Sequence, residues 1–191
     1  MPPATSLISL FVEPISRAGI DYVVTGGLAT VIYGFPRMTL DVDLVLRLPE
    51  GDADRFSRLW PAADFYVPPL ETIREESRRP EHGHFNVSHH ETAMRADVYL
   101  AGGSELNGWA LNNRAIRRIE GVDVQVAPIE AVILGKLRYY QIGGSDRHLR
   151  DIDHLLKVNE NTIRFLTLER WVARLDLDGA WRSARSYREQ P

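Results

Sequence analysis

The spacing of apolar residues changes close to residue 126, and this change constrains the fold more than any other feature of the sequence. Before it, short runs rich in β-branched and aromatic residues end at glycine or polar positions, which is typical of strands. After it, apolar residues recur every three or four positions, which is typical of helices. The sequence therefore predicts an α+β protein, with an α/β core over residues 1–126 and a helical region over residues 127–191 packed on that core.

The individual segments follow from the same patterns. We expect strands at residues 22–24, 39–48, 65–67, 85–89, 94–100, 115–119 and 122–126. We expect helices at residues 7–18, 28–33, 52–60 and 70–78, then at 128–143, from residue 145 onward, and once or twice within 167–185. The strands at 85–89 and 94–100 should pair, and those at 115–119 and 122–126 should form a hairpin turning at Glu120 and Gly121.

Two aspartates lie two positions apart in the expected strand at residues 39–48. Because alternate residues of a strand leave the same face of the sheet, the carboxylates of Asp41 and Asp43 should point to one side. A cation between them would relieve their repulsion, and Mg²⁺ (or Mn²⁺) takes hard oxygen ligands of this kind. The alternative is a solvent-exposed acidic pair at a strand edge.

A third acid, Asp97, lies in the expected strand at residues 94–100 with apolar neighbours on both sides. If the two strands are neighbours in the sheet, all three carboxylates can meet. Three such carboxylates suffice for phosphoryl transfer with two metal ions, one carrying the phosphates and one activating the attacking hydroxyl.

Two glycines, Gly26 and Gly27, separate the first expected strand from a short helix. Glycine there lets backbone N–H groups approach phosphate oxygens, and the N-terminus of the helix adds a favourable partial charge. The alternative is a tight strand-to-helix turn that binds nothing. The segment is neither a Walker loop nor a G-x-G-x-x-G dinucleotide turn.

The order of these motifs is more specific than any one of them. The segment G-G-x-A at residues 26–29, followed by G-x-P-R-x-T-x-D-x-D at residues 34–43, resembles the opening of the DNA polymerase β-like nucleotidyltransferase superfamily. Within it, the chain resembles small prokaryotic proteins that group with abortive-infection toxin nucleotidyltransferases and some aminoglycoside nucleotidyltransferases. The resemblance continues through residues 85–87, 95–97, 134–138 and 143–152, so it covers most of the chain. It implies the minimal nucleotidyltransferase fold, a small mixed sheet with flanking helices.

Carried over residue by residue, the resemblance also implies the site. Gly26 and Gly27 would form the phosphate turn, although many members of the superfamily have Gly-Ser there. Asp41, Asp43 and Asp97 would be the metal ligands and the catalytic residues, with Asp97 a candidate base. The residues implied to bind the nucleotide are Gly26, Gly27, Arg37, Thr39 and Lys136.

The cationic residues also have a plainer interpretation. Lys136 interrupts an apolar helical stretch and either holds the triphosphate or extends its stem over apolar surface to reach water. Arg37 either binds phosphate or braces the loop before Asp41. Arg150 and Asp151 either form an internal ion pair that orients Lys136 or form an exposed pair that contributes little to stability.

Composition limits the partners. A net charge of −3 creates no global field that attracts nucleic acid or an anionic membrane, so a polyanionic substrate needs a local site or metal ions. The absence of cysteine excludes disulfides and thiolate metal sites. No apolar run approaches the roughly 20 residues that span a bilayer. We expect a cytoplasmic protein with no membrane partner and no signal peptide in residues 1–6.

Two polar clusters leave alternatives open. Four histidines between residues 82 and 90 favour a polar strand face over a zinc site, because they have no cysteine and no H-E-x-x-H spacing beside them. The arginines at 114, 117 and 118 are either a solvated hairpin face or contacts for an RNA backbone.

Together these features predict an enzyme that transfers a nucleoside monophosphate from a nucleoside triphosphate to a hydroxyl and releases pyrophosphate. The acceptor is open: a tRNA end, a protein side chain or a small polyhydroxylated molecule. The alternative is a catalytically silent nucleotide-binding or protein-interaction module, for instance one partner of a toxin–antitoxin pair. The three acids favour the enzyme, because an unused carboxylate cluster is destabilising.

Overall fold

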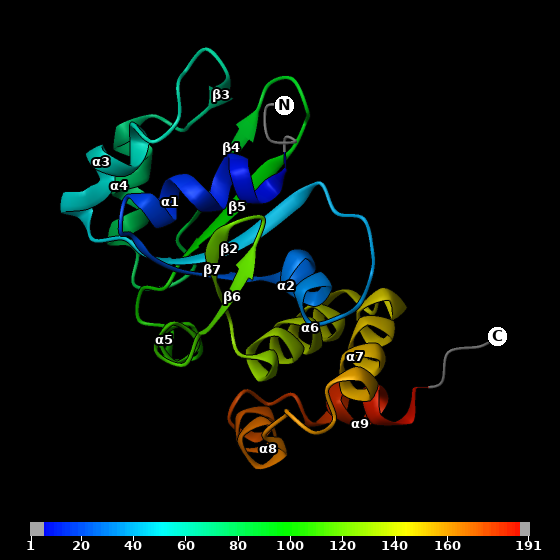
Figure 1. Cartoon of the computed structure of the whole chain (residues 1–191). Coiled ribbons are helices and arrows are strands. Elements are labelled where there is room, and N and C mark those ends of the chain that lie inside the picture. The colour runs from blue at the N-terminus through cyan, green and yellow to red at the C-terminus, as the bar shows by residue number, and fades with distance from the viewer. Residues whose placement is uncertain (1–5, 188–191) are drawn as a thin grey trace. The chain divides into compact units, whose positions relative to one another are not determined.

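The computed structural model describes residues 6–187, so the signal-peptide expectation falls largely outside the described residues (Figure 1). The strands are β1 (Asp21–Thr25), β2 (Asp41–Arg47), β3 (Phe65–Tyr66), β4 (His84–His89), β5 (Arg95–Leu100), β6 (Ala115–Ile119) and β7 (Val122–Val126). The helices are η1 (Ile8–Val12), α1 (Glu13–Arg17), α2 (Gly26–Ile32), η2 (Glu50–Asp52), α3 (Ala53–Ser57), α4 (Leu70–Arg78), α5 (Glu105–Asn112), α6 (Ile129–Gly143), α7 (Asp146–Val158), α8 (Phe165–Arg174) and α9 (Asp178–Ser186).

The chain divides into two compact units. The first contains the residues up to Leu28 together with Met38–Ala127, and it holds the strands. The second contains Ala29–Arg37 together with the chain from Pro128 onward. Residues 29–37 therefore group with the C-terminal helices, although in the sequence they lie between two strands. Within the described residues, no helix combines the length and the apolar character that crossing a membrane requires.

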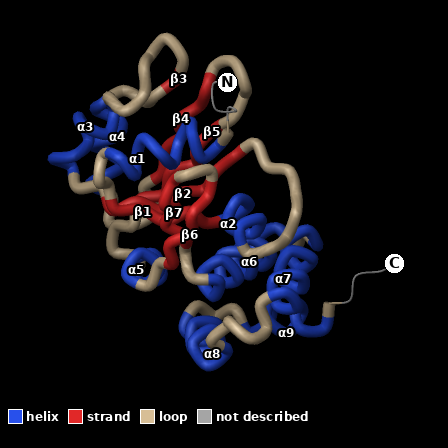
Figure 2. Tube along the Cα trace, viewed as in Figure 1, coloured by secondary structure: helices blue, strands red, loops and turns tan. Residues whose placement is uncertain are grey.

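The strands of the first unit form one mixed sheet in the order β3-β4-β5-β2-β1-β7-β6 (Figure 2). The central strand β2 pairs with β1 in antiparallel and with β5 in parallel orientation. The outer pairs β4–β5 and β6–β7 are antiparallel, as the sequence patterns predict. The expectation of an α+β protein with a small mixed sheet and flanking helices is confirmed.

One face of the sheet is apolar and buried. On β2 it presents Val42, Leu44 and Leu46, whose exposed fraction is 0%. In Figure 1, α1, α3 and α4 lie on one side of the sheet. Aromatic rings of helix and strand are in contact there. Phe56 of α3, for example, meets Phe85 of β4 edge-to-face with ring centroids 5.5 Å apart. Because apolar side chains fill this face, the residues that alternate with them on β2 and β5 point to the opposite face.

Segments with strong local signals have the predicted bounds. The hairpin of β6 and β7 turns at Glu120 and Gly121, which have φ values of 50° and 80°. Positive φ at both central residues is the requirement of a type I′ turn, whose twist matches that of the flanking strands. Helix α4 covers Leu70–Arg78, and the region 167–185 contains parts of two helices, α8 and α9.

Other segments differ from the prediction. Helix α5 is not among the predicted elements, although Ser104 accepts a hydrogen bond from the Asn107 N–H at its N-terminus and three apolar residues of the helix are buried. The helix predicted at 52–60 is wrong in extent, because α3 ends at Ser57 and the Asp52 side chain makes no capping bond. The helix predicted at 7–18 begins as the π-helical segment η1 before α1.

Candidate active site

Three of the predicted site residues lie on one face of the sheet in two neighbouring strands. In the parallel pair β2–β5, Asp43 lies opposite Asp97, and Asp41 lies opposite Arg95. Residues paired across a parallel ladder share a face, so Asp41, Asp43 and Asp97 all project from the face opposite Val42, Leu44 and Leu46. Thr25 of β1 continues the row of Asp43 on one side, and Asn86 of β4 continues the row of Asp97 on the other.

The glycine turn lies directly against Asp43. Gly26 has a φ of +58°, and a Cβ atom placed there would lie 1.8 Å from Oδ2 of Asp43. Any side chain at position 26 would therefore displace this carboxylate as well as strain the backbone. The N–H of Gly27 donates a hydrogen bond to the same oxygen, at 3.2 Å. The predicted turn and the predicted acid are thus one structural unit.

Thr39 lies beside Asp41. Its hydroxyl donates to the Asp41 carboxylate, and its Oγ1 lies 3.1 Å from the Asp41 carbonyl oxygen. The sequence predicts Thr39 as a nucleotide-binding residue. Its contacts in the structure are those of a residue that orients the first aspartate.

Arg95 brings a positive charge to the acids. Its Nε lies 3.3 Å from Oδ2 of Asp97, and its Nη2 lies 3.9 Å from Oδ2 of Asp41. Sequence reasoning missed this residue as part of the site. Its position two residues before Asp97 in a strand was a signal for it, because that spacing puts Arg95 on the face of the acids.

The carboxylate oxygens of Asp41, Asp43 and Asp97 suit a hard divalent cation, and Asp41 is more exposed than Asp97. The side chain of Asp41 is 40% exposed and that of Asp97 is 11% exposed. In the described part of the chain, no three His, Asp or Glu side chains already form an arrangement that could hold a metal ion. Asp41 and Asp97 instead interact with Arg95, and Asp43 accepts from Gly27. Asp41, Asp43 and Asp97 have the donor chemistry for Mg²⁺, which prefers one or two carboxylates and keeps several waters.

The two predicted cationic ligands, Lys136 and Arg37, lie in the second unit and share one carboxylate. Nζ of Lys136 lies 2.5 Å from Oδ2 of Asp151, and Nη1 of Arg37 lies 3.0 Å from the same oxygen. The side chains of Lys136 and Asp151 are only 7% and 4% exposed. Lys136 therefore does not extend to water, and Asp151, rather than an Arg150–Asp151 pair, holds it. Binding of nucleotide by Arg37 and Lys136 stays a prediction.

His148 borders this buried cluster. Burial and the nearby charge of Lys136 lower the pKa of His148 from its ordinary value of 6.5. Its Nδ1 is buried and has no hydrogen-bond partner among the described residues. The other face of the imidazole stacks on Tyr139, with ring centroids 5.8 Å apart. These surroundings disfavour the protonated form of His148 and lower its pKa in the folded protein.

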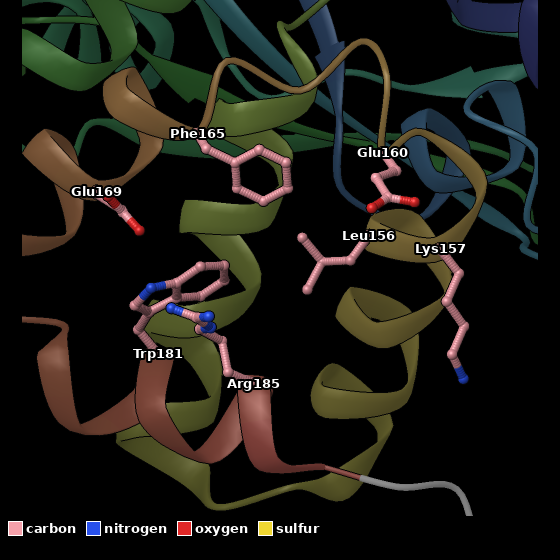
Figure 3. Close-up of a pocket in the computed structure, with 7 residues that line it drawn as sticks. All are labelled: Leu156, Lys157, Glu160, Phe165, Glu169, Trp181 and Arg185. Carbon is pink, nitrogen blue, oxygen red and sulfur yellow. The ribbon is translucent and has the colours of Figure 1, made fainter.

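The second unit also has an open cavity of about 450 Å³ that none of the predicted site residues lines (Figure 3). Phe165, Trp181 and Leu156 form its apolar walls, and charged residues of both signs surround them. Lys157 points away from the open space and binds Asp153 at 2.6 Å. This cavity has no cluster of acids and no glycine turn, so it lacks the groups that the chemistry predicted from the sequence requires.

No family model and no curated protein matches the chain. Several solved structures are similar to the chain. An antigenic nucleotidyltransferase-like protein from Paracoccidioides brasiliensis aligns with a TM-score of 0.58 at 21% identity, over 92% of this chain and 90% of the other. ANT(2″)-Ia in complex with adenylyl-2″-tobramycin aligns with a TM-score of 0.55 at 15% identity, over 94% and 97% of the two chains. The fold is nucleotidyltransferase-like. At these identities the similarity concerns the fold, and the chemistry has to be argued from the site.

Proposed function

We propose that the protein is a magnesium-dependent nucleotidyltransferase. It transfers a nucleoside monophosphate from a nucleoside triphosphate to a hydroxyl group of an acceptor. The observation that carries this proposal is the pairing of Asp43 with Asp97 on adjacent parallel strands, with the Gly26-Gly27 turn against Asp43. A nucleotidyltransferase-like fold alone would not distinguish an enzyme from a silent relative, whereas an acid cluster built around a glycine turn has a chemical use.

The proposed reaction is a displacement at the α-phosphorus. The acceptor oxygen forms a bond to that phosphorus, the bond from the α-phosphorus to the bridging oxygen breaks, and pyrophosphate leaves with the electron pair. The proton of the acceptor hydroxyl passes to the carboxylate of Asp97. Bound Mg²⁺, held by Asp41, Asp43 and Asp97, would neutralise charge on the phosphoryl oxygens.

The residues around the acids have positioning roles in this scheme. Thr39 fixes the carboxylate of Asp41 through its hydroxyl. The Gly27 N–H holds Asp43, and the absence of a side chain at Gly26 gives that carboxylate its space. We propose that the same turn approaches the triphosphate, because backbone N–H groups at the start of a helix bind phosphate oxygens.

The acceptor that we favour is a small polyhydroxylated molecule. ANT(2″)-Ia, which shares the fold, was solved with adenylyl-2″-tobramycin, a nucleotide joined to such a molecule. The face that continues from Asp97 onto β4 presents Asn86 and, in the next row beside Arg95, Ser88. These are neutral hydrogen-bonding side chains, which suit hydroxyl groups better than they suit a polyanion such as RNA.

The test is thermal unfolding with Mg²⁺ or Mn²⁺ and each of the four common nucleoside triphosphates, followed by an assay for pyrophosphate release. Ligand at 100 times its Kd stabilises a protein by about 2.7 kcal/mol, so binding should raise the Tm clearly. Asp43→Asn should abolish both the metal-dependent Tm shift and the release of pyrophosphate. Asp123→Asn is the matched control, because Asp123 lies in the same sheet in an exposed pair with Arg118.

Absence of any Tm shift and of pyrophosphate release with all four triphosphates would favour the other candidate in the form of a protein-interaction module that binds no nucleotide. A Tm shift without pyrophosphate release is expected both of a silent nucleotide-binding module and of an enzyme whose acceptor is missing from the assay; pyrophosphate release on adding an acceptor identifies the enzyme. Adding tobramycin or RNA as acceptor then separates the two acceptor classes.

A further inference from the structure

Arg95 interacts with two of the three carboxylates that the proposed function assigns to the metal. Its guanidinium is 3.3 Å from Asp97 through Nε and 3.9 Å from Asp41 through Nη2. A single side chain thus supplies positive charge between two acids of one sheet face. A divalent cation bound by Asp41 and Asp97 would bring its positive charge to the region that the guanidinium of Arg95 occupies.

The backbone determines this position of Arg95. Arg95 begins β5 and lies opposite Asp41 in the parallel ladder, two residues before Asp97. Its N–H donates to the carbonyl oxygen of Leu40, at 3.1 Å, which ties the start of β5 to the residue before β2. The stem of the side chain therefore starts from a fixed point on the face of the acids.

The side chain of Arg95 is much more exposed than that of the carboxylate it contacts most closely. Its side chain is 51% exposed, whereas that of Asp97 is 11% exposed. Exposed ion pairs of arginine with carboxylates are weak, because water competes for both partners and the long side chain loses conformational freedom in the pair. A ligand that binds the carboxylates more strongly can displace this guanidinium at small cost.

We propose that Arg95 is an internal competitor of the metal ion: it occupies Asp41 and Asp97 in the metal-free protein and must leave them when a divalent cation binds. This inference rests on the proposed function, because that proposal assigns the acids to a metal. Two consequences follow. Arg95 offsets part of the repulsion between Asp41 and Asp97 in the metal-free protein, and the affinity for metal alone is lower than the acids by themselves would give.

The competition has a clear electrostatic sign. Two positive charges about 4 Å apart repel even in water, and the repulsion doubles for a divalent ion. Neutralising Arg95 removes this repulsion and frees lone pairs of Asp41 and Asp97. A lysine at position 95 keeps the charge and should keep the competition.

The test measures binding of Mn²⁺ without nucleotide, by isothermal titration and by the electron paramagnetic resonance signal of free Mn²⁺. Arg95→Gln should bind Mn²⁺ roughly tenfold more tightly than the wild type, and Arg95→Lys should bind as the wild type does. Arg118→Gln is the matched control, because it removes one positive charge from an exposed pair in the same sheet, and it should leave the affinity unchanged. Arg95→Met, which keeps the apolar stem, gives a second neutral variant should Arg95→Gln fail to fold.

The outcomes separate this inference from the proposed function. Equal affinity in the wild type and the neutral variants would overturn the competition, while the metal site would stand. Weaker binding in the neutral variants would also overturn it, because Arg95 would then be orienting the acids for the metal. Failure of every protein, the neutral variants included, to bind Mn²⁺ without nucleotide would overturn the inference, while the metal-dependent function is tested separately by the Tm shift with metal and triphosphate together.

Discussion

Neutralising Asp151 should destabilise the protein strongly, because this carboxylate is the buried partner of two cations. Asp151 accepts from Lys136 at 2.5 Å and from Arg37 at 3.0 Å, and the side chain of Lys136 is only 7% exposed. The substitution Asp151→Asn removes the carboxylate charge that lies beside the buried ammonium of Lys136. Removing one partner of a buried ion pair costs about 3 to 5 kcal/mol, and we expect a loss in that range.

The assay is urea unfolding followed by circular dichroism, with the free energy of unfolding taken from linear extrapolation. Hydrogen exchange of α6 and α7 should show that the loss is centred on the helices that carry Lys136 and Asp151. Asp153→Asn is the matched control on the same helix. Asp153 pairs with Lys157, whose side chain is 64% exposed, so its loss leaves no buried charge and should cost at most about 1 kcal/mol.

A double substitution distinguishes lost charge compensation from lost packing. Lys136→Met combined with Asp151→Leu replaces the pair by apolar side chains, and it should recover part of the stability that Asp151→Asn loses, because Arg37 still loses its contact with the carboxylate. If Asp151→Asn is within about 1 kcal/mol of the wild type, then Lys136 finds water or another partner, and the interpretation of a tightly buried pair is refuted.

Two further predictions concern single residues. Because burial lowers the pKa of His148, the unfolded chain binds the proton of this residue more readily than the folded chain does. The contribution of His148 to stability should therefore be complete above pH 6.5 and should be lost as the pH falls through the folded pKa. His148→Gln should flatten this pH dependence of the free energy of unfolding, measured by urea titrations at several pH values. Gly26→Ala should lower the Tm and weaken Mn²⁺ binding, because the added Cβ would lie 1.8 Å from Oδ2 of Asp43. The control is Gly19→Ala: Gly19 has a similar φ of +66° but open space around it, so this substitution should cost only the conformational strain of about 1 to 2 kcal/mol. Equal losses of stability in the two variants would contradict the packing argument.

Much of the fold could be predicted because the decisive signals are local. The hairpin of β6 and β7 is encoded by two alternating runs around Glu120-Gly121, and helix α4 by its own periodicity. Helix α5 was missed although Ser104 and the residues after it carry a capping signal. At α3 the prediction relied on a capping signal that the structure does not use: Asp52 has the residue type of a helix cap, but its side chain pairs with Arg55.

The sequence by itself determined which acids the candidate site contains. The two-residue spacing of Asp41 and Asp43 in a strand fixes a common face, and Asp97 follows from a second strand with the same pattern. Whether the two strands are neighbours was a matter of sheet topology. Only the tertiary structure decided that β2 and β5 pair in parallel and that Asp43 lies opposite Asp97.

The tertiary structure also decided what the charged residues contact. Arg37 and Asp151 are 114 positions apart in the sequence, and no local pattern indicates that they share an oxygen with Lys136. The contact between Gly26 and Asp43 likewise joins two elements, because Gly26 follows β1 and Asp43 lies in β2. A sequence specifies spacing along one element through the period of its backbone, whereas contacts between elements depend on how those elements pack. For this reason the predicted acids could be placed on a common face, while the partners of the cations could not be named in advance.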